Sequence, residues 1–476
     1  MKPFKALLLL PVLSALAAGG DKPLKIGTNL QLFVDDYLIE SMKGVDLKLH
    51  SPQPAGKAIA FDKPWEGNLS AYVTVFQDGK RFRMYYRGTA DPAYINSSAL
   101  KPGEKAPRKI GQYTCYAESP DGIVWTKPSL GLYEFEGSKA NNIVWDGLGA
   151  HNFAPFRDDN PAAPASERYK AIGSEKGLFA FKSADGIHWQ RMGDKPIITD
   201  GAFDSLNVVF WDAARHRYVA VYRDFLQGVR TIKYATSEDF LKWTPGEWAD
   251  YGDAPAEQLY TNATVAYFRA PQIYLAFPKR FVFWRKPYDD ATGPGVSETV
   301  FITSRDGVHW DRRFMEAFVR PGRDRRDWVH RNRMAATGVV QTGNDELSIY
   351  VSRHYTFPDA FLERMSLRTD GFVSVHAGYK GGEFITKPLW IEGNKMVLNY
   401  ATSAVGSIRF EVQDLNGNPL PGYGLEETKL LYGDHIEDTV QLQSAKHQVG
   451  RGLEARPLRL RFVLKDADLY SIQIRE

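Results

Sequence analysis

The sequence predicts an all-β protein: a five-bladed β-propeller over residues 21–375, followed by a C-terminal β-sandwich over 376–476. Three observations lead to this prediction. A short turn unit recurs five times at similar spacing, and the segments between its copies alternate as strands do. Long runs of helical periodicity are absent. The repeat then stops at about residue 376, where the strand pattern continues without it.

The repeated unit is Ser-x-Asp-Gly-x-x-Trp, which is complete at residues 119–125, 183–189 and 304–310. A looser copy lies at 237–243, and a fifth, at 368–374, keeps only the Asp-Gly turn. Successive Asp residues of the unit are 64, 54, 67 and 64 residues apart. This spacing matches four short strands with their loops, so each copy marks one propeller blade.

The residue types of the repeated unit are those that a tight turn between two strands requires. Asp-Gly after a strand is typical of a tight turn, because Gly tolerates positive φ and Asp accepts hydrogen bonds from nearby amides. The Trp at fixed offset packs back on the strand. The sequence therefore predicts a structural hairpin in each blade rather than a catalytic motif.

Strand-like stretches flank these turns. They are Tyr72–Phe76, Arg81–Tyr86, Asn207–Trp211, Tyr218–Tyr222, Gln272–Phe277 and Leu347–Val351. The segment Leu24–His50 is expected to help close the ring. In the last hundred residues, the runs Lys395–Tyr400, Ser407–Gln413, Leu458–Leu464 and Tyr470–Ile474 fit the short strands of a sandwich.

Composition narrows the functional class. The chain of 476 residues has a formal charge of +3, which argues against a nucleic-acid partner. Met1–Gly20 reads as a signal peptide, so a secreted or periplasmic location is expected. No later apolar run is long enough for membrane insertion. The single cysteine, Cys115, is expected to be a small core residue.

In a propeller the innermost strand of every blade starts at one end of a central funnel. The turn units place these starts near residues 65–68, 149–155, 202–205, 257–262 and 327–332. Each start combines an acid or a His with an amide, and most add an aromatic side chain. Aromatic faces stack on sugar rings, and carboxylates and amides bind hydroxyls. A poly- or oligosaccharide is therefore the expected partner.

Glycoside hydrolysis needs a pair of carboxyl groups. Glu66, Asp204 and Glu257 lie at blade starts and are the catalytic candidates. We expect Glu257 to be the general acid and Glu66 the base or nucleophile. Asp204 would position the sugar or tune the pKa of the acid. The pairs Asp35-Asp36 and Asp158-Asp159 rank lower, the second because it reads as a loop.

The candidates for substrate binding come from the same blade starts and the segments that follow them. They are Trp65, His151, Asn152, Tyr260, Asn262, Lys279, Arg280, His330, Arg331 and His354. The three histidines would bind hydroxyls or serve as an unusual acid. Lys279, Arg280 and Arg331 would meet an anionic sugar group such as sulfate or uronate. The charged run 320–327 is expected to be a solvated loop.

No cofactor is expected, because metal-binding and phosphate-binding motifs are absent from the sequence. An axial calcium ion is compatible with the architecture but has no sequence signature.

Five blades with this turn unit, followed by a sandwich, resemble the five-bladed propeller glycoside hydrolases of families 32, 43 and 117. Several strings more specifically resemble secreted planctomycete-type proteins labelled family-32-like glycosyl hydrolases. These strings are Leu32–Glu40, His151–Phe156, Tyr267–Pro271, Phe277–Phe281, Leu367–Val375 and Asp466–Tyr470. The resemblance implies a three-carboxylate site at the inner ends of the first blades. The sucrose-binding motif Asn-Asp-Pro-Asn-Gly of family 32 is missing, so fructosidase activity is not implied.

Two other functions stay open. A non-catalytic, lectin-like propeller would have funnel aromatics and no opposed carboxyl pair, whereas a scaffold propeller would have a plugged funnel. The turn unit also resembles the Asp-box of sialidases, with one residue fewer between Asp and Trp. Sialidases use six blades and an arginine triad, neither of which the sequence provides.

Overall fold

The computed structural model describes residues 22–95, 100, 106–285, 293–441 and 456–476. The predicted signal peptide, Met1–Gly20, lies outside these ranges. Apart from the short 3-10 helices η1 (Pro92–Tyr94), η3 (Ala165–Glu167) and η4 (Arg325–Asp327), the elements of the described chain are β-strands. The described part holds no helix long and apolar enough to cross a membrane.

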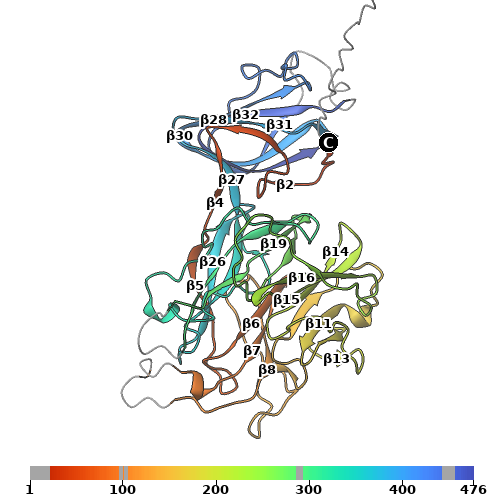
Figure 1. Ribbon diagram of the computed structural model, residues 1–476, viewed down its shortest axis with the longest axis vertical. Helices are drawn as coiled ribbons and strands as arrows, with labels where there is room; N and C mark the ends of the chain where they lie inside the picture. Colours follow the sequence, from red (N-terminus) through yellow and green to blue (C-terminus); the bar gives the residue numbers. More distant parts are fainter. Residues whose placement is uncertain (1–21, 96–99, 101–105, 286–292, 442–455) are drawn as a thin grey trace, which may run out of the picture.

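Five four-stranded antiparallel sheets confirm the predicted five-bladed propeller, the lower body in Figure 1. Blade one contains β6 (Ala71–Asp78), β7 (Arg81–Gly88), β8 (Tyr113–Ser119) and β9 (Ile143–Asp146). Blade two contains β10 (Ala154–Arg157), β11 (Tyr169–Ser174), β12 (Leu178–Ser183) and β13 (Gln190–Arg191). Blade three contains β14 (Val208–Asp212), β15 (Arg217–Leu226), β16 (Val229–Ser237) and β17 (Glu247–Trp248). Blade four contains β18 (Val265–Tyr267), β19 (Ala270–Ala276), β22 (Ile302–Ser304) and β23 (Trp310–Asp311).

Blade five closes the ring with a strand from the other end of the propeller. It contains β24 (Val340–Gln341), β25 (Glu346–Arg353), β26 (Phe361–Arg368) and, as its outer strand, β5 (Gln53–Ala60). Because β5 precedes blade one in the chain, its antiparallel pairing with β26 joins the two ends of the ring. Blade four carries an additional hairpin, β20 (Lys279–Val282) and β21 (Val296–Thr299), between its second and third strands.

The expectation that Leu24–His50 closes the ring is wrong. This segment forms β1 (Leu24–Lys25), β2 (Gln31–Leu32), β3 (Ile39–Lys43) and β4 (Asp46–Leu49), which pair with C-terminal strands. A strand that alternates in the expected way can pair with any exposed edge, and the local pattern does not identify the edge.

The second domain, the upper body in Figure 1, is built on one eight-stranded sheet. It combines β2–β4 with β27 (Val373–Ala377), β28 (Gly382–Thr386), β30 (Lys395–Gln413), β31 (Asp434–Gln441) and β32 (Arg459–Arg475), while β29 (Leu389–Trp390) pairs with β1. Residues from both ends of the long strands β30 and β32 share one apolar core, so the sheet folds over on itself. β4 and β27 lie at the junction of the two bodies.

The turn units connect the third and fourth strands of blades one to four, as the sequence predicts. In the first copy, Asp121 Oδ1 accepts hydrogen bonds from the amides of Ile123 and Val124 at 2.8 and 2.9 Å, and Trp125 Nε1 donates to the Gly122 carbonyl. The turns also join neighbouring blades. Tyr85 of blade one donates to the Gly186 carbonyl at 2.8 Å, which ties the turn of blade two to blade one.

The fifth turn marks the exit from the propeller. Asp370 is buried and accepts hydrogen bonds from the Tyr267 hydroxyl at 2.5 Å and from Arg269 Nε at 3.0 Å. The chain continues from this turn into β27 of the second domain rather than into an outer strand. Ser374 stands at the Trp position of this copy, where it is buried within β27.

We predict that Gly338→Ala destabilises the ring junction. Gly338 has φ +130, and a Cβ at this position would lie 1.9 Å from the Val75 carbonyl oxygen of blade one. The clash must be relieved by moving backbone, which costs on the order of 3 kcal/mol or more. Thermal unfolding measures the effect. Gly193→Ala is the matched control, since no atom lies within 4 Å of its added Cβ; equal midpoints for the two variants would contradict the prediction.

Candidate active site

The starts of the five innermost strands converge at one end of the propeller, as predicted, and each contributes one side chain. These five residues, here called the funnel ring, are Tyr72, His151, Asp204, Tyr260 and Arg331. The Tyr72 and His151 rings meet edge to face with centroids 5.4 Å apart. His151 Nε2 lies 3.0 Å from Asp204 Oδ1, and the Tyr260 hydroxyl lies 3.5 Å from Asp204 Oδ2.

Two residues from second strands close the contact between blades five and one. Arg331 Nη1 donates to the Tyr355 hydroxyl at 3.2 Å, and Arg87 Nη2 reaches the same oxygen at 3.4 Å. Arg87 also contacts His151 Nδ1 at 3.2 Å, while its guanidinium lies 4.5 Å from the centroid of the Tyr72 ring. Side chains from all five blades therefore form one connected constellation.

A cavity of about 290 Å³ opens beside the funnel ring. Its lining includes Arg87, Gln112, His151, Arg331 and Tyr355. The combination of aromatic rings, guanidinium groups and an imidazole around a hollow of this size is typical of a small-molecule or sugar subsite.

Asp204 and His151 form the reactive pair of the funnel ring. The Asp204 side chain is 66% exposed and that of His151 is 30% exposed, so both can contact a ligand. The hydrogen bond from His151 lowers the pKa of the Asp204 carboxyl well below its usual range, helped by the positive charges of Arg223 and Arg331. Burial lowers the pKa of His151, with a smaller opposing effect of Asp204. At neutral pH the pair is a carboxylate beside a neutral imidazole.

Cationic side chains gather around Tyr260. Lys279 Nζ lies 3.8 Å from the centroid of the Tyr260 ring, and the guanidinium carbons of Arg223 and Arg230 lie 4.8 and 5.1 Å from it. Burial, reinforced by the charges of Arg331, Arg223 and Arg230, lowers the pKa of Lys279 far below its usual value. Burial and the same Arg331 charge lower the pKa of the neighbouring His330 to about 4.

The backbone at the funnel is strained. Tyr72, Ala263 and Arg331 have φ values of 54, 44 and 65, in the left-handed region that residues with a Cβ rarely adopt. Such conformations cost of order 1–3 kcal/mol each and persist where the surrounding structure enforces them. Two of the three are funnel-ring residues, and nine other non-glycine residues of the described chain also have positive φ.

Glu66 and Trp65 do not reach the funnel ring. The Glu66 carboxylate is fully buried inside blade one, where it accepts hydrogen bonds from Tyr86 at 2.6 Å and from Lys127 Nζ at 2.5 Å. The Trp65 indole donates to Asn142 Oδ1 at 2.7 Å. With every carboxylate oxygen paired and no solvent access, Glu66 is placed as a structural ion-pair partner.

Glu257 and Arg280 are also engaged with each other. Glu257 Oε1 lies 2.8 Å from Arg280 Nη1, and its Oε2 lies 2.6 Å from Arg312 Nη2. Arg280 further pairs with Glu298. These contacts hold Glu257 in blade four, so the three predicted catalytic carboxylates do not face one another.

Asn152 and Asn262, predicted to bind substrate, are buried and bind backbone. Asn152 Nδ2 donates to the carbonyls of Phe203 and Ser205, which fixes the loop that carries Asp204. Asn262 Nδ2 donates to the Val221 carbonyl at 3.1 Å. Their amides position the funnel ring from beneath.

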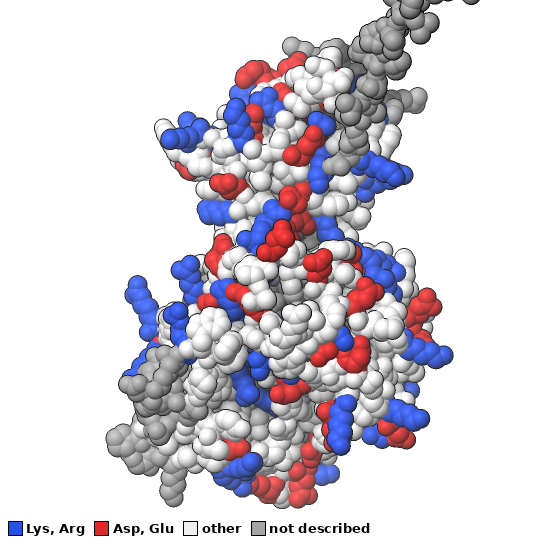
Figure 2. Space-filling view, viewed as in Figure 1, with Lys and Arg blue, Asp and Glu red and all other residues white. Residues whose placement is uncertain are grey.

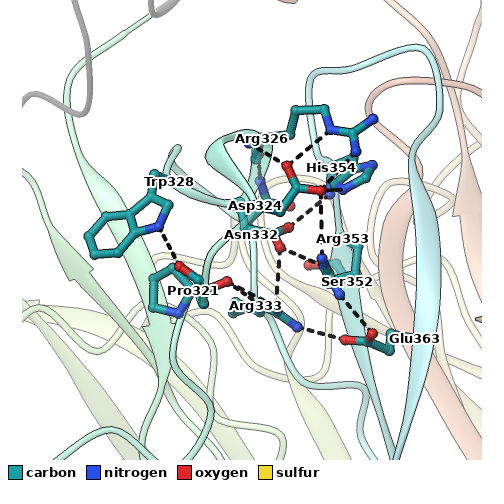
Figure 3. A network of polar contacts seen from close by, with 12 residues as sticks. Pro321, Asp324, Arg326, Trp328, Asn332, Arg333, Ser352, Arg353, His354 and Glu363 are labelled. Atoms are coloured by element: carbon teal, nitrogen blue, oxygen red, sulfur yellow. Dashed lines mark hydrogen bonds and ion pairs between the residues drawn. The ribbon is translucent and has the colours of Figure 1, made fainter. Parts of the chain in front are cut away.

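His354 lies in the polar network of Figure 3. Its Nδ1 and Nε2 are 2.9 and 3.0 Å from Asp359 and Asp324. Below it, Arg333 and Arg353 share the carboxylates of Asp327 and Glu363. The network anchors the loop that presents Arg331. The run 320–327 is thus only partly the solvated loop expected, because Asp327 is fully buried.

The two lower-ranked acid pairs are structural as well. Asp35 and Asp36 pair with Arg305 and Arg313 of blade four and so join the two domains. Asp158 is buried against Lys170 and the Tyr218 hydroxyl. Cys115 is buried and free, as expected.

The sequence analysis missed Tyr72, Arg87, Arg223, Arg230 and Tyr355. Arg87, Arg223 and Tyr355 lie at or just after the ends of second strands, which antiparallel pairing returns to the funnel end. The candidates Lys279, Arg280 and His354 follow the second strands of blades four and five, but the corresponding ends in blades one and three had no candidate. Extending the same turn-based phase to the second strand of each blade would have found these three residues.

Within the described ranges, no group of three or more His, Cys, Asp or Glu side chains is arranged to hold a metal ion.

The known proteins that are similar to this chain are solved structures of low sequence identity. No family model and no curated protein matches it. A solved structure named "Glycoside hydrolase" is similar with a TM-score of 0.46 and 14% identity, covering 67% of this chain and 92% of that one. The catalytic domain of a family 62 α-L-arabinofuranosidase from Coprinopsis cinerea has a TM-score of 0.43 and 11% identity, covering 68% of this chain and 98% of that one.

A family 43 arabinoxylan arabinofuranohydrolase from Bacillus subtilis, solved with cellotetraose, covers 89% of this chain and 99% of its own. Its TM-score is 0.38 and its identity 10%. The five closed sheets described above thus give this chain the five-bladed propeller architecture that the sequence resemblance implied.

We predict that Glu66→Gln lowers stability without altering the funnel. The neutral side chain leaves the buried Lys127 ammonium without its main counter-charge, which costs about 3–5 kcal/mol. Asp62→Asn is the control, because Asp62 is the other carboxylate near Lys127 but is 61% exposed; it should cost under about 1 kcal/mol. Thermal unfolding compares the two variants. A Glu66→Gln protein as stable as wild type would show that the ion pair is not structural.

A second prediction concerns the coupling of Asp204 and His151. Asp204→Asn removes the negative charge that favours the imidazolium, so the pKa of His151 should fall further. Conversely, His151→Gln should raise the pKa of Asp204 towards its ordinary value. Titration of the imidazole signals by NMR measures the first shift, and a His151→Gln spectrum assigns the signal. An unchanged His151 titration in Asp204→Asn would mean that the two groups are not coupled in solution.

Proposed function

We propose that the protein is an exported glycoside hydrolase that cleaves O-glycosidic bonds of a poly- or oligosaccharide in the propeller funnel. Asp204 is its reactive carboxylate and His151 its partner. The observation that carries the proposal is this exposed, ionised carboxylate, hydrogen-bonded to the imidazole of His151, which lines a cavity of about 290 Å³ together with residues of blades one and five.

The chemistry follows from the two protonation states. A carboxylate with a lowered pKa can accept a proton from water or attack the anomeric carbon, and both are steps of glycoside cleavage. His151 holds the carboxylate in place, takes up the proton that Asp204 receives from the attacking water, and passes it to the leaving glycosidic oxygen as the bond to the anomeric carbon breaks. Because the two groups are 3.0 Å apart, they act on the same side of the substrate, as one unit rather than as an opposed acid and base.

This assignment replaces the roles expected for Glu66 and Glu257, whose carboxylates are held in ion pairs outside the funnel ring. Tyr72 and Tyr260 are buried, with Arg87 over one ring and Lys279 over the other, and Arg331 supplies donors for the oxygens of a sugar. Export rests on the N-terminal leader of the sequence; cell fractionation that found the protein only in the cytoplasm would contradict it.

A lectin-like propeller is the second candidate. The observation in its favour is that, of the three predicted catalytic carboxylates, only Asp204 lies in the funnel ring. Such a protein would bind the saccharide through the same aromatic and cationic groups and release it intact.

An activity screen decides between the two. We expect the wild-type protein to release new reducing ends from a member of a polysaccharide and aryl-glycoside panel. Asp204→Asn and His151→Gln should each lower kcat about 10²–10⁴-fold, the range for losing a proton-transfer group. The control is Asp194→Asn, whose side chain is 90% exposed on blade two. Saccharide binding without turnover in the wild-type protein would support the lectin-like function instead.

A further inference from the structure

We propose that the saccharide bound in the funnel carries a carboxylate or sulfate group, recognised by Arg223, Arg230 and Arg331 beside Tyr260. Lys279 is buried beside the same Tyr260 ring. The proposal rests on the proposed function and names the substrate class of the same funnel.

The first observation is that these cations lack acidic partners. Among the residues that the structure describes, none of the four forms an ion pair with Asp or Glu. Arg223 Nε donates to the Ala202 carbonyl at 2.9 Å, Arg230 Nη1 to the Gln258 side chain at 3.0 Å, and Arg331 Nη1 to the Tyr355 hydroxyl at 3.2 Å. Each of these acceptors is neutral, and the Asp204 carboxylate, which interacts with the cations electrostatically, offsets them only in part because one carboxylate faces several cations.

Many other buried and half-buried guanidinium groups of the described chain pair with carboxylates, whereas Arg217 donates to the Tyr234 hydroxyl. Arg83 pairs with Asp78 at 2.7 Å, Arg312 with Glu257 at 2.6 Å, and Arg333 with Glu363 at 2.7 Å. On the surface, acidic and basic side chains are interspersed over the face seen in Figure 2. The funnel is therefore an exception to the charge balance of the molecule.

Lys279 is the extreme member of the group. Its side chain is fully buried, and its Nζ has no hydrogen-bond partner in the described chain. An unpaired buried cation is costly, and so are guanidinium groups crowded around one ring. A chain that retains such a cluster gains from it when a ligand brings the missing negative charge.

The cationic cluster around Tyr260 also lies close to Asp204, the proposed reactive carboxylate. Tyr260, around which the cations gather, has its hydroxyl 3.5 Å from Asp204 Oδ2. The guanidinium carbons of Arg223 and Arg230 also lie 5.2 and 5.1 Å from the centroid of the Phe225 ring. A sugar ring at Asp204 would thus place an acidic substituent against preoriented donors, the arrangement that favours charge-assisted hydrogen bonds.

Binding to Asp204→Asn protein tests the proposal separately from turnover. Calorimetry at constant ionic strength would compare a galacturonate oligosaccharide, its methyl ester, a sulfated carrageenan oligosaccharide and a neutral cello-oligosaccharide. We expect at least one acidic probe to bind about tenfold or more tightly than both neutral probes. Which acidic probe is preferred identifies the anionic group.

Arginine variants localise the effect. Arg230→Gln should weaken binding of the preferred acidic probe about tenfold, and Arg230→Lys, which keeps the charge, should lose less. Arg191→Gln is the matched control, since Arg191 is an exposed arginine paired with Asp194 on blade two. Thermal midpoints equal to that of the parent show that each variant is folded.

The outcomes separate this proposal from the proposed function. Equal affinity for acidic and neutral probes, no binding of any probe, or equal losses in Arg230→Gln and Arg191→Gln would overturn the anionic site. If the protein hydrolysed neutral substrates only, the anionic site would be overturned and the proposed hydrolase function would be supported. Tight acidic binding without any hydrolysis by the wild-type protein would support the site and overturn the hydrolase.

Discussion

The pairing of β5 with β26 is the constraint on which the funnel depends. Five twisted sheets placed around an axis leave two free ends, and this antiparallel ladder removes them. Once the ring is closed, the five innermost strands start around one axis, and residues as far apart in sequence as Tyr72 and Arg331 become neighbours. The contacts from Tyr72 through His151, Asp204 and Tyr260 to Arg331 are a consequence of closure.

Charged side chains occur in two settings in this protein. Those in buried ion pairs have a structural role, and those at the funnel ring are available to a ligand. Glu66–Lys127 and the Asp327–Arg333–Glu363 network are buried and paired, so they fix loops without reactivity. At the funnel ring, Asp204 is exposed and the surrounding cations have neutral hydrogen-bond partners. Unpaired charge and left-handed backbone occur together there, as expected where a fold gives up stability for binding.

The repeat made the fold predictable. A turn that needs Ser, Asp, Gly and Trp at fixed offsets leaves a signature at each copy, and its spacing gives both blade number and phase. The phase placed Asp204, His151, Tyr260 and Arg331 at one end of the ring. It could not show which carboxylates are neutralised, because Lys127 and Arg312 lie 61 and 55 residues from Glu66 and Glu257. Nor does a local pattern identify the partner of β4, which lies more than 300 residues further along the chain.

The strands β2–β4 have one further consequence, for the order in which the chain acquires its structure. They pair with β27, β28 and β32, so the propeller is an insertion within the second domain rather than a unit placed before it. During synthesis the ring can close as soon as β26 has emerged. By contrast, β3 and β4 stay without partners until β28 and β27 have been made, and β2 waits for β32, the last strand. Contacts of such long separation form slowly, and in the meantime these edges are open to wrong pairing.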